Sequence, residues 1–566
     1  MDRRVVSAIL LMMAIAIVPS FFLKPKPALP AALAPVTPTP AAVLPSPVAA
    51  AAPKAGLVVG DSAAAAAVTV VPQDTVFVRT PLATYGFSTR GARLVSASIA
   101  GYPSLDPAAA GAPANLVADG RGLFGSTLIA GGQSLDIADW DFVPSAATVE
   151  ALTAPGTLLL TATRGAVTVA LRITVPHDDY QLAVAGTVTG IGANGGSLLL
   201  ELGDGIRETE KDVAENARAA GLVTKAVAID AERHDFSSLD SAETKTIDGQ
   251  FEWIAVKSKY FVTAVFAFDS TQGRFAGARL TAPPTEDVTR ASAVTSLPVK
   301  ADGSLAFGAY VGPMEYARLT AIGHDFDDVN PYGWPGFRGM IRFFSTPVRW
   351  LLVQMHTTAK LPWGVALVLF GVLIRLLLWP LNQKAMRSSM EMQAIQPMLE
   401  DLKKKYSGDQ QKFAQKQMEL FKEHRVNPLG GCLPMLLPWP VMLALFFVFQ
   451  NTIELRGAPF LWLPDLSLKD PFYIVPVLMG ATMYATMKIG AMGTPPNDQQ
   501  KMMTTIMPIM MTVMFAGFAS GLNLYYTVQN LVSIPQQWLL LQERKKRGLV
   551  AAVAAKTAPV VGTKKK

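Results

Sequence analysis

Charge is scarce in this sequence: of its 566 residues only 16% are Asp, Glu, Lys or Arg, whereas 50% are hydrophobic. The mean hydropathy of +0.30 is too high for a soluble protein of this size. The composition therefore indicates a membrane protein that also has a substantial soluble part. The formal net charge is +7, and the basic residues gather in a few segments.

Cysteine is almost absent as well. The single cysteine, Cys432, excludes an internal disulfide. It does not exclude a periplasmic domain, because proteins of that compartment are permitted disulfides but do not require them.

Motifs for covalent chemistry are also missing. The sequence has no Walker motif, which argues against ATP hydrolysis by this chain. Residues 68–330 contain no GxSxG motif and no cluster of metal ligands, and His177, which follows Pro176, is expected in a turn. We therefore expect neither an enzyme nor a protein with a metal or another cofactor.

The first 67 residues divide into an apolar and a Pro/Ala-rich segment. Residues 1–23 begin with two arginines and continue as a long apolar run. This pattern predicts a transmembrane anchor in preference to the alternative, a cleaved signal peptide, because the run is long for a signal sequence. Residues 24–67 are rich in Pro and Ala and are predicted to be a semi-extended linker.

Residues 68–330 have the pattern of an all-β domain. Short runs of β-type residues recur between turn residues, at Thr75–Arg79, Arg93–Ile99, Thr157–Thr163, Val167–Val175, Gln181–Val188, Ser197–Leu202 and Tyr260–Phe268. Many of them alternate apolar and polar residues, which predicts a large β-sandwich. The two arginines before the N-terminal apolar run place this domain on the outer side of the membrane under the positive-inside rule.

Residues 334–360 are predicted to form an amphipathic helix on the membrane surface, which Pro347 kinks or divides. Its apolar positions recur at helical spacing, at Phe337, Ile341, Phe344, Val348, Leu351 and Met355. The alternative is a helix that packs on the β domain.

The rest of the chain alternates between apolar and charged segments. Apolar stretches at 361–382, 432–452, 471–489, 503–519 and 521–541 are predicted transmembrane helices. Between and after them lie a charged helical hairpin at 383–429, loops at 453–470 and 490–502, and a basic tail at 542–566. With the N-terminal anchor this makes six spans, and the positive-inside rule places the hairpin, the tail and both termini in the cytosol.

Arg375 is the one charged residue inside the span 361–382. A guanidinium in hydrocarbon costs at least about 2.5–3.5 kcal/mol and is usually functional, facing a polar cavity. The alternative is that Arg375 reaches the near interface, because Asn382 lies only about 10 Å further along a helix. The later spans offer no Asp or Glu within their apolar cores as a partner.

Polar residues in the last span are candidates to line a recess with Arg375. Asn523, Tyr526, Gln529 and Asn530 offer hydrogen-bonding groups, and Tyr525 and Tyr526 provide amphipathic rings. The alternative places the tyrosines in an interfacial belt and makes the amides contacts between helices.

Several stretches together resemble the YidC-type membrane protein insertases of the YidC/Oxa/Alb family, in their six-span Gram-negative form. They are YGW at 332–334, LIRLLLWPLNQKAMRSSMEMQAIQPML, FKEHRVNPLGGCLP, ELRGAPFLWLPDLSLKDPFYIVPVLMG and SGLNLYYTVQNLVSIPQQ. Weaker echoes in the β domain are FSTRGARLVSASIAGYP, WIAVKSKYF and YVGPMEY.

The resemblance implies a five-helix insertase core in the bacterial inner membrane with a hydrophilic groove for nascent membrane proteins. The family's groove arginine falls on Arg375, and its paired aromatic positions fall on Tyr525 and Tyr526. Where the family often carries a glutamine, this chain has Pro438 followed by Trp439, so Trp439 is expected to shape that wall of the groove.

The implied partners are nascent membrane proteins and the Sec translocon with its accessory subunits, and no small-molecule substrate is expected. The basic hairpin, with Lys403, Lys404 and Lys405, is expected to make nonspecific contacts to the ribosome and to anionic lipids. Two other functions remain open from the residues alone: a small-solute transporter or channel with Arg375 as an anion site, and an envelope sensor or scaffold that acts through residues 68–330.

Overall fold

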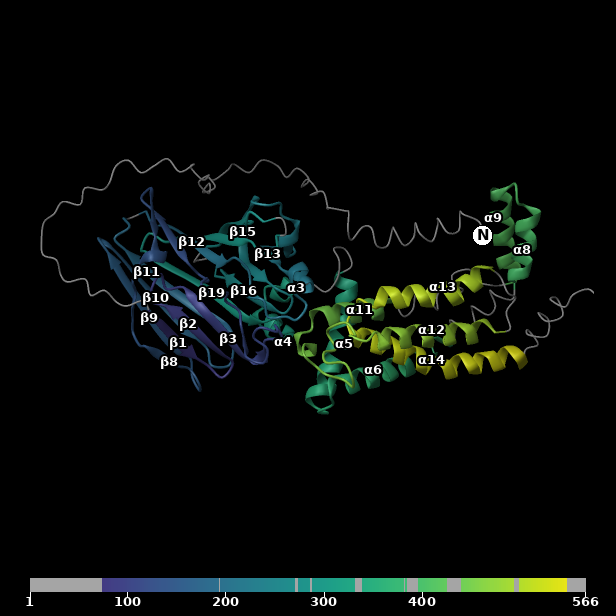
Figure 1. The fold of residues 1–566 in the computed structure, drawn as a ribbon. Coiled ribbons are helices and arrows are strands. Elements are labelled where there is room, and N and C mark those ends of the chain that lie inside the picture. The colour runs from purple at the N-terminus through teal and green to yellow at the C-terminus, as the bar shows by residue number, and fades with distance from the viewer. Residues whose placement is uncertain are drawn as a thin grey trace, which may run out of the picture.

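The computed structural model describes residues 74–192, 194–269, 273–285, 288–330, 338–380, 382–383, 395–424, 439–492 and 498–546. The predicted anchor at 1–23, the linker at 24–67 and the tail beyond residue 546 lie outside the described residues. Figure 1 shows a β-rich part in the first half of the chain and a helical part in the second half.

The β-rich part contains a smaller sheet of five strands. In spatial order they are β4 (Pro113–Asn115), β3 (Leu94–Pro103), β2 (Ala83–Ser88), β1 (Thr75–Arg79) and β8 (Thr148–Glu150). All neighbours are antiparallel except β1 and β8.

The larger sheet has fourteen strands among the described residues. Its order is β6 (Gln133–Asp136), β5 (Ser126–Ala130), β12 (Gly196–Gly203), β18 (Ser292–Val299), β17 (Phe275–Thr281), β15 (Thr244–Lys257), β16 (Phe261–Phe266), β19 (Ser304–Pro313), β11 (Gln181–Thr189), β10 (Val167–Val175), β9 (Gly156–Arg164) and β7 (Val143–Pro144). The long strand β15 also pairs with β13 (Gly221–Ala226), which pairs with β14 (Glu232–Asp235).

The two sheets share one hydrophobic core. Along β11 the residues alternate between this core and solvent, with Leu182 and Val184 buried and Ala183 exposed, as expected for a sheet with one buried face. The hydroxyl of Tyr85 in β2 donates to the carbonyl of Val311 in β19 at 3.0 Å and so links the sheets. The predicted β-rich domain is confirmed, with α3 (Val213–Ala219) and α4 (Tyr316–Ile322) as its short α-helices.

The helical part consists of α5 (Arg338–Thr357), α6 (Trp363–Leu377), α8 (Gln396–Lys405), α9 (Gln410–Glu423), α11 (Trp439–Asn451), α12 (Ile474–Ala491), α13 (Asp498–Phe515) and α14 (Ser520–Lys546). In the described part of the chain, α12 is the one helix long and apolar enough to cross a membrane. Trp363–Leu377 and Met502–Phe515 are apolar but shorter.

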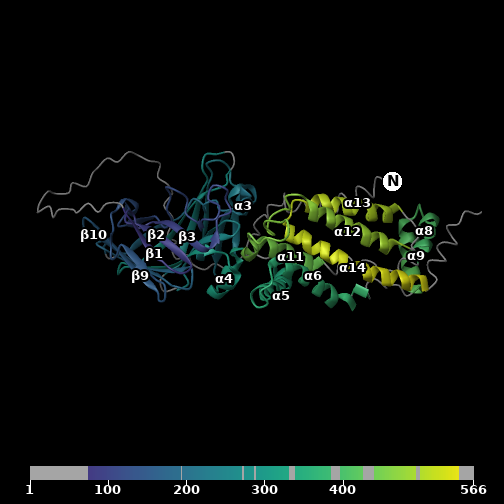
Figure 2. The same cartoon turned by 60° about the horizontal axis from the view of Figure 1, so that its bottom comes forward.

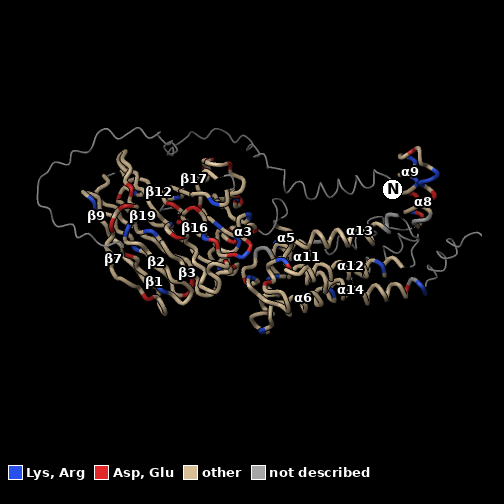
Figure 3. Tube along the Cα trace, in the orientation of Figure 1, with Lys and Arg blue, Asp and Glu red and all other residues tan. Residues whose placement is uncertain are grey.

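The long helices form a bundle in which α14 packs against α6 and α12, and α13 packs against α12. Both views place the β-rich part at one end of this bundle and the α8–α9 pair at the other end (Figures 1 and 2). Figure 3 shows that Lys and Arg gather on α8 and α9, while the middle of the bundle carries few charges. Asp409 begins α9 by accepting a hydrogen bond from the backbone N–H of Lys412 at 3.0 Å.

The sequence pattern predicted the wrong exposed face for α5. Ile341 and Val348, assigned to the membrane-facing stripe, are buried in the core of the helical part. The exposed large apolar residues are instead Met340, Phe343 and Trp350, of which Phe343 and Trp350 are 73% and 62% exposed. Pro347 lies inside α5 and does not divide it.

A single helical turn after α11 joins the two parts of the molecule. Within η6 (Ile453–Leu455), Ile453 belongs to the core of the β-rich part and Leu455 to the core of the helical part. Glu454 forms an ion pair with Arg349 of α5. The guanidinium of Arg349 also lies over the ring of Tyr316 in α4, 4.5 Å from its centroid.

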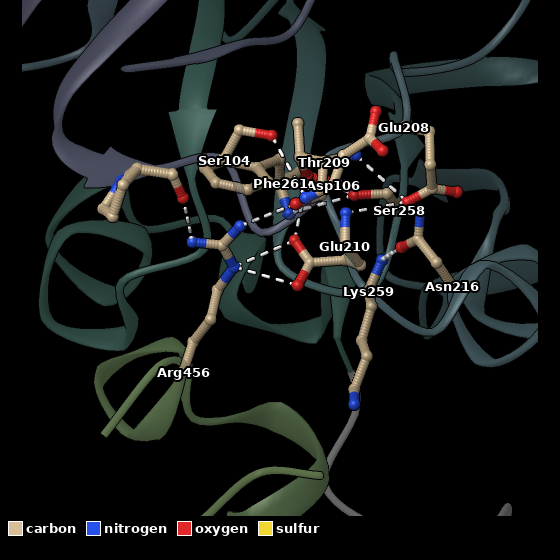
Figure 4. Close-up of polar contacts among 11 residues, drawn as sticks. Ser104, Asp106, Glu208, Thr209, Glu210, Asn216, Ser258, Lys259, Phe261 and Arg456 are labelled. Carbon is tan, nitrogen blue, oxygen red and sulfur yellow. Dashed lines mark hydrogen bonds and ion pairs between the residues drawn. The ribbon is translucent and has the colours of Figure 1, made fainter. Parts of the chain in front are cut away.

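The next residue, Arg456, reaches into the β-rich part (Figure 4). Its Nε lies 2.9 Å from both carboxylate oxygens of Glu210, and its Nη1 and Nη2 donate to the carbonyls of Pro103 and Thr209 at 2.7 and 3.0 Å. The two charged side chains are only 1% and 5% exposed. Burial raises the pKa of Glu210, and the charge of Arg456 opposes this by stabilising the carboxylate.

We expect Arg456→Met to loosen the contact between the two parts, because it leaves Glu210 buried without its cation. Removing one partner of a buried ion pair typically costs about 3–5 kcal/mol. Hydrogen exchange of the backbone amides around Glu210 should accelerate in the purified protein. The matched control is Arg121→Met, which breaks the exposed pair with Asp204 and should cost less than about 1 kcal/mol. Unchanged exchange near Glu210 in Arg456→Met would contradict this account.

Candidate functional site

Arg375 lies in the last turn of α6, beside α14. Its side chain is half-buried, and its Nη2 donates to Oε1 of Gln536 at 2.9 Å. Its buried Nε has no hydrogen-bond partner, and no carboxylate of the described residues forms an ion pair with it. Arg375 is therefore a fixed positive charge whose described partner is a neutral amide.

Gln536 is the residue of this site that sequence reasoning missed. It is 1% exposed, and its Nε2 donates at 3.2 Å to the carbonyl of Trp379, which lies just after the end of α6. The spacing between Gln529 and Gln536 in the sequence could have indicated the role of Gln536. Gln529 lies seven residues earlier, on the same face of the helix, and its Nε2 donates to the carbonyl of Gly371 at 2.7 Å. The two glutamines therefore hold α6 on either side of Arg375.

The two tyrosines pack within the bundle. Tyr525 is buried, and its ring centroid lies 6.0 Å from that of Phe370 on α6. Tyr526 contacts Phe515 of α13 with a centroid separation of 5.3 Å, and its buried hydroxyl has no hydrogen-bond partner among the described residues. The rings of Tyr525 and Tyr526 are 5.5 Å apart.

The two asparagines join helices. Asn523 is fully buried, and its Nδ2 donates to the carbonyl of Phe515 at 2.9 Å, across the turn between α13 and α14. The Nδ2 of Asn530 donates to the carbonyl of Met479 in α12 at 3.3 Å. Both amides therefore make the kind of interhelical contact that buried polar groups need in an apolar bundle.

The remaining predicted site residues lie elsewhere. Pro438 is outside the described residues, as is the side chain of Trp439, whose backbone begins α11. Lys403, Lys404 and Lys405 are exposed in the last turn of α8, where the negative end of the helix dipole favours cations. Helix α8 lies at the end of the molecule opposite the β-rich part (Figure 1).

This arrangement suits the attraction of an acidic group. At an effective dielectric constant of about 20, a carboxylate about 4 Å from a guanidinium gains about 4 kcal/mol. Arginine keeps its proton in proteins, so the site offers a permanent charge and not a titrating one.

Two family models match adjacent parts of the chain. The model described as the YidC periplasmic domain matches residues 75–351, and the model described as 60Kd inner membrane protein matches residues 354–547. The first corresponds to the β-rich part with most of α5, and the second to the remaining helices.

Curated relatives agree with these models. Proteins named membrane protein insertase YidC are 41% identical over 260 residues in Oleidesulfovibrio alaskensis and 36% identical over 322 residues in Thioalkalivibrio sulfidiphilus. The matches cover 44% and 56% of this chain and 47% and 56% of those proteins, so the chain spans about half the length of the curated relatives it matches.

Among solved structures, the chain is similar to a crystal structure of an active YidC insertase with its first transmembrane domain resolved. That likeness covers 82% of this chain and 94% of the other at 18% identity, and its TM-score of 0.33 is too low to carry an argument. The family models and the curated relatives carry the assignment: the chain belongs to the YidC family of membrane protein insertases.

Proposed function

We propose that this protein inserts newly made proteins into the bacterial inner membrane and helps them fold and assemble, both alone and together with the Sec translocon. The observation that carries this proposal is Arg375, a half-buried cation held by an amide inside an apolar helix bundle. The names of the curated relatives support the same activity.

The proposed step is transfer of a polar segment and involves no covalent reaction. The polar flank of a client segment enters a hydrophilic groove at Arg375, where it escapes hydrocarbon, in which each unsatisfied backbone group costs several kcal/mol. The apolar part of the client then moves into lipid, and burial of its apolar surface drives the step. Tyr525 and Tyr526 form the aromatic wall beside the cation, while Asn523 and Asn530 hold the helices that carry it.

The proposed topology has six spans with both termini in the cytosol and the β-rich part in the periplasm. It is supported by the distribution of the described residues: the β-rich part and the Lys-rich α8–α9 pair lie at opposite ends of the bundle (Figures 1 and 3). The basic end fits the cytosolic side under the positive-inside rule. We propose that Lys403, Lys404 and Lys405 there contact ribosomal RNA and anionic lipid headgroups.

We propose that helix α5 lies at the periplasmic surface of the membrane. Phe343 and Trp350, seven residues apart on one helix face, are exposed, while Arg342 and Arg349 pair with Asp327 and Glu454 of the protein. An exposed apolar face beside internally paired charges suits a helix that rests in the membrane interface.

We expect Arg375→Ala to reduce insertion of a short client with an acidic flank by about tenfold, because it removes the attracting charge. Arg375→Lys keeps the charge and should retain most activity. The control is Arg121→Ala, which removes an exposed cation of the β-rich part. Insertion is measured by protease protection after depletion of the native protein. If deleting the β-rich part abolishes insertion while Arg375→Ala affects no client, the groove account fails.

We expect the exposed face of α5 to contact lipid. Nitroxide labels are attached to Phe343→Cys and Trp350→Cys, in a protein whose own Cys432 has been replaced. Both labels should be relaxed more by oxygen than by a water-soluble nickel complex, because oxygen concentrates in the bilayer. A label at the exposed position Thr320 of α4 should show the opposite order. Equal water accessibility at all three positions would rule out the interfacial placement.

A further inference from the structure

The side-chain amide of Gln536 binds Arg375 with its oxygen and the nearby backbone with its nitrogen. Oε1 accepts from Nη2 of Arg375 at 2.9 Å, and Nε2 donates to the carbonyl of Trp379 at 3.2 Å. Gly371 and Arg375 are four residues apart and lie on one face of α6, and Trp379 follows two residues after the end of α6. Since Gln529 binds the carbonyl of Gly371, two glutamines of α14 fix the segment that carries Arg375. The orientation of the guanidinium is therefore built into the packing of α14 on α6.

The chemistry of this partner differs from that at other buried arginines. Arg349 and Arg456, whose side chains are 9% and 1% exposed, each pair with a carboxylate. Their charges are cancelled where they lie, and they join parts of the protein. At Arg375 the corresponding partner is an amide, which accepts one hydrogen bond but carries no charge. The guanidinium is therefore oriented without being neutralised.

We propose that Gln536 is a positioning residue that holds Arg375 in the groove while leaving its positive charge available to acidic groups of the client. The inference rests on the proposed insertase function and adds to it the residue that orients the cation. The buried Nε of Arg375 has no partner among the described residues, so the protein satisfies the guanidinium only in part. A glutamate at position 536 would occupy the same space, pair with Arg375 and cancel the attraction.

The test uses Gln536→Glu in the full-length protein and two short single-span clients that differ only in the translocated flank, which carries two Asp or two Asn. We expect Gln536→Glu to lower insertion of the Asp client about tenfold and to leave the Asn client within about twofold. The matched control is Gln537→Glu, which adds the same charge one residue later. The side chain of Gln537 lies near Gly490 of α12, so both clients should insert within about twofold of the parent protein.

A second measurement separates positioning from a structural role. The new Arg–Glu pair should keep or raise the melting temperature of the purified protein in detergent, so loss of Asp-client insertion would not follow from unfolding. If Gln536→Glu lowers the melting temperature, the variant Gln536→Leu is used to test whether Gln536 positions Arg375. It keeps the charge but removes the anchor, and should reduce the preference for the Asp client about threefold.

Arg375→Ala is measured in parallel to separate the inference from the proposed function. If Arg375→Ala loses the Asp client but Gln536→Glu inserts it as well as the parent does, Gln536 has no such role and the groove account stands. Equal loss of both clients in Gln536→Glu likewise overturns the inference. If Arg375→Ala inserts every client normally, the proposed function of Arg375 fails first.

Discussion

The ion pair between Arg456 and Glu210 determines how the β-rich and helical parts meet. Both charges are almost completely buried, and separating them would leave a carboxylate without solvent or cation. Glu210 therefore dictates where the chain lies as it leaves α11. Since Ile453 and Leu455 of the same turn enter the two hydrophobic cores, the placement of the bundle against the sheets depends on this short segment.

The partners of the arginines distinguish charges that the protein cancels from one that it leaves uncancelled. Arg349 and Arg456 meet carboxylates at the contact between the two parts, where a cancelled charge costs least. Arg375 meets Gln536 inside the bundle. An amide satisfies one donor and fixes a direction, but it leaves the field of the cation intact. The burial of Arg375 is thus offset only in part by the protein, and an incoming anion can supply the rest.

The sequence predicted the strand Thr75–Arg79 with its observed bounds, because alternation and flanking turn residues are local signals. It failed on the face of α5, since that helix carries two apolar faces and periodicity does not say which one meets protein. It also missed Gln536, whose partner lies 161 residues earlier in the chain. A glutamine within an apolar helix is ambiguous until packing of α14 on α6 places it beside a cation.

The position of Arg375 along α6 bears on how it acts. Gly364, near the start of α6, lies so close to Phe460 of the 453–470 loop that a Cβ there would clash with the ring. Arg375 is eleven residues further, about 16 Å along the helix axis. In the proposed topology, with the start of α6 at the edge of a hydrocarbon core about 30 Å thick, this is about half the depth. Under that proposal, a polar flank that enters from the end marked by α8 and α9 would meet the cation midway, where hydrocarbon would otherwise be most costly for it.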